Sequence, residues 1–236
     1  MANYRENIQK AYEIRKGVTK FIREAVEEIR TEKSKIENNI NLSYEGKKEA
    51  TKKLQDKYEK GFLTIMKQKE DEVNALIDEA KVNAENVLTA TLPPVSNTQQ
   101  KLFDMTLKNV EGKVTFALGT NQAFAALDEL MQAVNEPLLA QQALDKFLPL
   151  SMTALSLAAD TERPAVKQRL GKIYEQLDAR AQVEGAGEAR EALQTINAMK
   201  GAGYVTGYVQ DAVKEISMDS YNYVNRPNEY FAAKGE

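Results

Sequence analysis

The chain has 236 residues, of which 42% are hydrophobic and 28% charged, and its formal net charge at pH 7 is −3. These values are typical of one large or two modest globular domains with a buried core. Cys, His and Trp are absent, which removes disulfides, thiol nucleophiles, zinc–thiolate sites and the commonest general base. A hydrolase, a zinc enzyme or a redox enzyme is therefore a poor candidate, and we expect no enzymatic activity.

Charge is spread along the chain without a basic stripe. Residues 1–90 carry 18 Lys and Arg against 17 Asp and Glu, and residues 91–236 carry 14 against 18. Specific nucleic-acid binding is therefore not expected. The sequence shows no secretory leader pattern and no apolar run of about 20 residues, so an intracellular protein without a membrane span is expected.

The first long helix is predicted from Tyr4 to about Ile40. Its apolar residues recur mostly at steps of three, four or seven, which is the seam of a coiled coil. They are Ile8, Ala11, Val18, Ile22, Ala25, Ile29, Ile36 and Ile40. Because almost all other positions are charged or amide, this helix is expected to pack on a partner along one narrow stripe.

A turn and a second long helix are predicted to follow. Asn38–Ser43 is rich in Asn and Ser, which compete with the helical backbone for hydrogen bonds, and Ser43 suits the N-cap of the next helix, with Glu45 in its first turn. The second stripe contains Leu54, Tyr58, Phe62, Ile65, Val73, Leu76, Ala80, Ala84 and Val87. The short loop favours antiparallel neighbours, so residues 1–88 are predicted to form a coiled-coil arm about 55–65 Å long at 1.5 Å per residue.

The remaining chain is predicted to form a second helical part. Residues 89–98 contain Pro93 and Pro94, which cannot continue a helix, and form a linker. Residues 99–217 are richer in apolar side chains, are interrupted by Gly and by Pro137, Pro149 and Pro164, and are predicted to form a compact helical bundle. Its expected core is Leu127, Leu130, Val134, Leu144, Phe147, Leu155, Leu170, Ile173, Leu177, Ile196, Tyr208 and Val213. Residues 218–236 are predicted to be an irregular, Tyr-rich tail. The fold class is therefore all-α, a long antiparallel hairpin followed by a multi-helix bundle.

Candidate chemistry is weak throughout. The stretch Gly201–Gly207 misses the dinucleotide spacing by one residue, Gly171-Lys172 lacks the rest of a phosphate loop, and Gly185–Gly187 indicates a helix stop and restart. The carboxylates of Glu70–Glu72 and Asp78-Glu79 are adjacent in sequence and point apart on a helix, and Asp219–Asn228 lacks calcium-loop spacing. We therefore predict no catalytic residue, no cofactor-binding residue, no metal site and no cofactor.

A sequence pattern found in structural proteins of tailed phages and prophages of Gram-positive bacteria resembles one segment of this chain. The segment follows the Lys/Glu-rich first helix and reads Asn41-Leu-Ser-Tyr-Glu-Gly-Lys-Lys-Glu-Ala50. The resemblance covers residues 1–88 and transfers no site residue. It implies a viral structural protein of the virion: a scaffold, minor head, inner-core, or portal- or tail-associated component. Its expected partners are further copies of itself and other virion or assembly proteins, located in the virion or the host cytoplasm.

Three other interpretations stay open. The arm could be a self-contained hairpin rather than a docking element. The protein could be a bacterial coiled-coil adaptor or chaperone that uses the arm tip at Asn38–Ser43 as a clamp. It could also be a membrane-active protein, either a pore former or an ejected protein, using the apolar segment Leu138–Ala159, although Pro149 and two charges inside that segment favour buried bundle helices.

Overall fold

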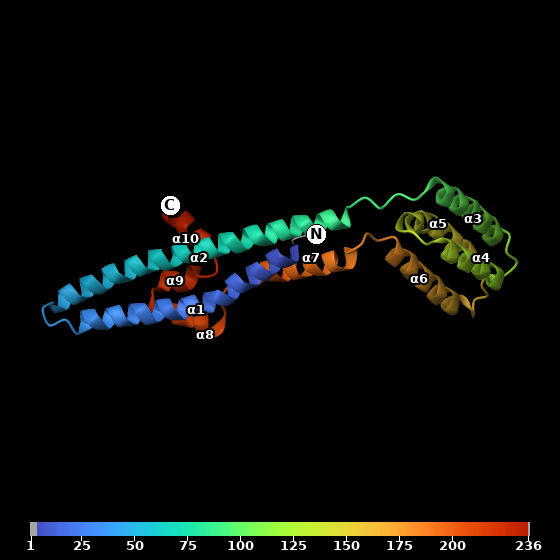
Figure 1. Cartoon of the computed structure of the whole chain (residues 1–236). Helices are drawn as coiled ribbons and strands as arrows, with labels where there is room; N and C mark the ends of the chain where they lie inside the picture. Colours follow the sequence, from blue (N-terminus) through green and yellow to red (C-terminus); the bar gives the residue numbers. More distant parts are fainter. Residues whose placement is uncertain (1–3, 236) are drawn as a thin grey trace. The chain divides into compact units, whose positions relative to one another are not determined.

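The computed structural model describes residues 4–235, and every regular element among them is a helix (Figure 1). The predicted all-α fold, with a long hairpin and further helices, is confirmed. The chain divides into two compact units. Unit 1 contains the chain up to Asn86 and again from Gly187 onward, and unit 2 is the continuous segment Val87–Ala186.

The hairpin of unit 1 consists of α1 (Tyr4–Glu37) and α2 (Tyr44–Leu88), 34 and 45 residues long. The turn between them falls at the predicted Asn and Ser residues, and the Ser43 hydroxyl accepts a hydrogen bond from the Gly46 N–H at 3.1 Å. This bond satisfies one of the free N–H groups at the start of α2. Ile40, predicted as the last seam residue of the first helix, instead lies in the turn and is 94% exposed.

Most of the predicted seam forms the interface between α1 and α2. Val18, Ile22 and Ile29 are fully buried in one core with Phe62 and other α2 residues, and the Phe21 ring stacks on the Phe62 ring at a centroid distance of 5.6 Å. The buried positions shift from the prediction at a few places: Val26 is more buried than Ala25, Ile77 more than Leu76, and Asn7 more than Ile8.

The short helices after Gly187 pack on the hairpin, which corrects two predicted boundaries. They are α7 (Ala186–Gly201), α8 (Gly207–Ala212), the 3₁₀ turn η1 (Val213–Glu215), α9 (Met218–Tyr223) and α10 (Pro227–Lys234). Val205, Val213, Ile216, Val224, Tyr230 and Phe231 join the hairpin core. The bundle therefore does not extend to residue 217. Two short helices, α9 and α10, form where an irregular tail was predicted, because their apolar side chains complete the core between α1 and α2.

Unit 2 contains α3 (Asn97–Thr115), α4 (Thr120–Ala133), α5 (Pro137–Ser156) and α6 (Arg163–Arg180) around its own core. Leu127, Leu130, Phe147 and Leu177 lie in this core, as predicted. Ile196 and Val213 were assigned to this bundle but belong to unit 1, and Tyr208 is 77% exposed. The helix α3 begins at a capping box formed by Ser96 and Gln99, which ends the Pro-containing linker.

Pro149 was predicted to break the helix, but α5 runs through it. Proline costs roughly 3 kcal/mol inside a helix. However, Phe147 and Leu150, on either side of it, are both buried in the core of unit 2, while Pro149 itself is exposed. The buried apolar face therefore holds the helix together, and the free carbonyl of the preceding turn lies on the solvent side.

Because the two cores share no residue, a cavity in one should leave the other unchanged. Ile216 is fully buried among residues of α1, α2 and the C-terminal helices. We expect Ile216→Ala to lower the free energy of unfolding of unit 1 by about 2–5 kcal/mol. Hydrogen exchange should show faster exchange in α1, α2 and α8–α10, with α3–α6 unaffected. Leu127→Ala should give the reverse pattern, and equal loss of protection in both units would contradict two separate cores.

Candidate interaction surface

Several carboxylates of α2 contact the C-terminal helices. No group of three or more His, Cys, Asp or Glu side chains arranged to hold a metal ion occurs within residues 4–235. The Asn228 amide donates hydrogen bonds to Glu70 (2.8 Å) and Asp71 (3.3 Å), and Asp78 pairs with Lys200 at 2.6 Å. These carboxylates therefore anchor α7 and α10 to α2.

The glycine-rich stretch Gly201–Gly207 is a connection between helices. Asn225 fixes it: its Oδ1 accepts from the Val205 N–H and its Nδ2 donates to the Val205 carbonyl, both at 2.8 Å. A Cβ at Gly203 would come within 3.3 Å of the Asn225 side chain. A larger residue at this position would therefore require a small shift of the Asn225 side chain. Gly185 has a positive φ of 82° just before α7 begins, which agrees with the predicted helix restart.

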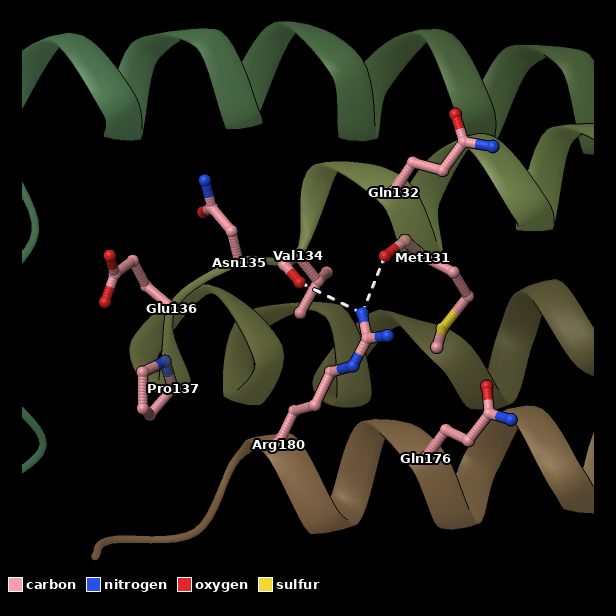
Figure 2. A pocket seen from close by; sticks show the side chains of 8 residues that line it. All are labelled: Met131, Gln132, Val134, Asn135, Glu136, Pro137, Gln176 and Arg180. Carbon is pink, nitrogen blue, oxygen red and sulfur yellow. Dashed lines mark hydrogen bonds between the residues drawn. The ribbon is translucent and has the colours of Figure 1, made fainter.

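An open pocket of unit 2 measures about 600 Å³ and lies at the end of α4 (Figure 2). Arg180 reaches from α6, and its Nη1 donates to the carbonyls of Met131 (2.7 Å) and Val134 (3.0 Å). These are carbonyls at the C-terminal end of α4, where the helix dipole favours a cation. The other polar residues of the pocket are Gln132, Asn135, Glu136 and Gln176. This arrangement caps a helix, and it pairs no nucleophile with a base.

Two turns, unlike the polar pocket at the end of α4, expose large apolar side chains to solvent. At the turn of the hairpin, Ile40 is 94% and Tyr44 80% exposed. In unit 2, the turn between α3 and α4 presents Phe116 (82% exposed) and Leu118 (91% exposed). Each turn contains a hydrogen bond between backbone and side chain. The Asn41 N–H donates to Asn39 Oδ1 and the Leu118 N–H donates to Gln122 Oε1, each at 2.9 Å. Neighbouring exposed apolar side chains can mark binding surfaces, so these two turns are the candidate interaction surfaces.

Charge is segregated along α2. Residues 44–69 contain eight lysines and four carboxylates, whereas residues 70–88 contain six carboxylates and one lysine. The adjacent half of α1, residues 4–20, carries five basic and two acidic side chains and so lies beside the acidic half of α2 in the hairpin. This complementarity favours the antiparallel arrangement, because it brings unlike charges together at the base of the arm.

Burial is the main cause of a raised pKa at two groups of α2, Tyr58 and Glu70. Burial, followed by its 2.8 Å hydrogen bond to Glu28, raises the pKa of Tyr58 to about 12, so this phenol remains a neutral donor that ties α2 to α1. Burial also raises the pKa of Glu70 above its ordinary value, against the opposing effect of the Asn228 amide.

Comparison with known proteins gives no relative: no family model, no curated protein and no solved structure matches the chain. Among the described residues, no helix is both long enough and apolar enough to cross a membrane.

We expect Arg180→Ala to destabilise unit 2 by about 1–2 kcal/mol, because the last carbonyls of α4 lose charge-assisted hydrogen bonds that remain partly open to water. The measurement is the urea concentration at the midpoint of unfolding of unit 2, with hydrogen exchange in α3–α6 as the probe of unfolding. Lys172→Ala is the matched control, since Lys172 is an exposed cation on the same helix. Equal effects of both substitutions would show that the capping bonds contribute nothing.

The raised pKa of Glu70 predicts a pH-dependent contribution to stability. The Glu70 carboxyl binds its proton more tightly in the folded protein than in the unfolded protein. Protonation of Glu70 therefore stabilises the fold at pH values below the unfolded pKa, and this stabilisation is lost as the pH rises through the folded pKa. Glu70→Gln should therefore make unit 1 at least as stable at pH 7 and should flatten its stability over the pH range that begins at the ordinary Glu pKa and extends above it. Thermal unfolding across this pH range tests it, and a Gln variant less stable at pH 7 would contradict it.

Proposed function

We propose that this protein is a non-enzymatic structural or assembly protein that works by binding other protein molecules through its helical arm. In the form that the sequence resemblance favours, it is a virion component of a tailed phage, such as a scaffold, minor head, inner-core or portal- or tail-associated protein. Its partners are then further copies of itself and other virion proteins.

The observation that carries the proposal is the exposed apolar turn at the end of the arm. Figure 1 shows the turn end of the hairpin extending beyond α8–α10 as α1 and α2 alone. In that part Ile40 and Tyr44 expose most of their surface to solvent. A turn needs polar residues or glycine, and large apolar side chains there gain stability only when a partner covers them.

The test is assembly of the full-length protein, with a molecular mass of 26.4 kDa per chain. Light scattering coupled to gel filtration should give a mass above that of one chain, or a stable complex with purified head, portal or tail proteins. The variant carrying Ile40→Ser and Tyr44→Ser should lose at least tenfold in affinity for that complex while keeping its helical content. Tyr208→Ser is the matched control, because Tyr208 is an exposed aromatic residue of the same unit. A strictly monomeric protein that binds none of these proteins would contradict the proposal.

A second candidate function, membrane activity, is favoured by a different observation. Phe116 and Leu118 are exposed on one turn, and Leu148 and Met152 are exposed one helical turn apart on α5. Such side chains can insert at a lipid interface. Leakage from vesicles of neutral and anionic lipid tests this function. No leakage and no vesicle binding by the full chain, or equal leakage by a variant with Phe116→Ser and Leu118→Ser, would remove it.

A further inference from the structure

One flank of α2 is left uncovered by the C-terminal helices. Their side-chain contacts with α2 reach Glu59, Lys67, Glu70 and Asp78. At about 100° per residue, these positions lie on one side of the buried α2 stripe. The opposite side carries Gly61, Ile65, Gln68, Glu72, Leu76 and Glu79, which we call the uncovered flank.

The uncovered flank has the spacing of a second coiled-coil seam. Its residues follow one another at steps of three and four, so they form a line along the helix. Ile65 is 39% exposed, Leu76 is half-buried, and a Cβ placed at Gly61 would meet no atom within 4 Å. A further helix can therefore approach α2 closely at Gly61, where no atom of unit 1 occupies the space of a side chain.

The distribution of charge along the hairpin indicates that the helix packing on the uncovered flank belongs to a second copy of this chain. In the half of the hairpin nearer the turn, residues 21–69, there are twelve basic and nine acidic side chains. The half nearer the base, residues 4–20 and 70–88, has six basic and eight acidic ones. A second arm lying antiparallel places each half against the half of opposite sign, whereas a parallel arm places like charges together.

We propose that two copies of this chain pair antiparallel through the uncovered flank of α2, with the two-fold axis near residues 69 and 70, where the sign of the charge changes. The inference rests on the proposed function and adds the surface and the orientation. In this arrangement, two residues face each other across the interface when their residue numbers add up to about 140. Ile65 then lies against the second copy's Leu76, and Lys69 lies beside the second copy's Glu72. The contact is isologous, because each flank supplies both members of every pair.

Cysteine cross-linking of the full chain tests the surface and the orientation, because the chain has no cysteine of its own. Gln68→Cys should form a covalent dimer with a short bismaleimide, since the two copies of residue 68 meet near the axis. Asn74→Cys, on the side of α2 that faces away from the flank, is the matched control and should stay monomeric. Two copies of Glu79→Cys should not react, because they lie roughly 27 Å apart along the arm at 1.5 Å per residue. A mixture of Glu79→Cys and Gly61→Cys should react. Efficient self-linking of Glu79→Cys would overturn the antiparallel orientation.

A non-covalent measurement completes the test. Ile65→Asp should raise the dissociation constant of the dimer at least tenfold in sedimentation equilibrium, with unchanged helical content. Raising the salt concentration from 0.05 M to 0.5 M should also weaken the dimer, because exposed charge pairs are screened. An oligomer that survives Ile65→Asp and gives no Gln68→Cys cross-link overturns this interface but leaves the proposed function standing. A monomer that also binds no virion protein removes both.

Discussion

Burial of the apolar stripe between α1 and α2 is the interaction on which the rest of unit 1 depends. Two isolated helices can cover only part of such a stripe, and most helical stability in proteins comes from packing of the apolar face. In this chain Ile22, Ile29 and Leu63 reach full burial, and they share their core with Val213, Ile216 and Phe231 from the C-terminal helices. The chain therefore forms the hairpin, builds unit 2 from an inserted segment, and then returns to complete the first core.

The hairpin could be predicted because its signals are local. The three-and-four spacing of apolar residues, the Asn-rich turn and the Ser43 cap each lie within a few residues of the structure that they specify. The return of residues 187–235 to the hairpin could not be predicted in the same way. Ile196 and Val213 have the same short apolar pattern as residues of unit 2, and nothing local distinguishes which core a short helix completes. The mistaken assignment thus concerns tertiary partners and not secondary structure.

The same distinction explains the smaller differences. Pro149 is a strong local signal for a helix end, but the buried residues on both sides of it belong to one core, and tertiary packing outweighs the local cost. Arg180 was not singled out in the sequence, because one arginine near a helix end carries no pattern; only the fold brings it to the carbonyls of Met131 and Val134. The spacing of apolar residues extends the predicted seam of the first helix to Ile40, whereas the two asparagines directly before Ile40 indicate the turn in which it lies.

The arm separates the groups that stabilise it from the groups available to a partner. The Phe21 and Phe62 rings stack between α1 and α2, with the Lys69 ammonium 5.7 Å from the centre of the Phe21 ring. Under the proposed function, unit 1 would fold completely before it meets a partner, and association would add contacts without repacking the core.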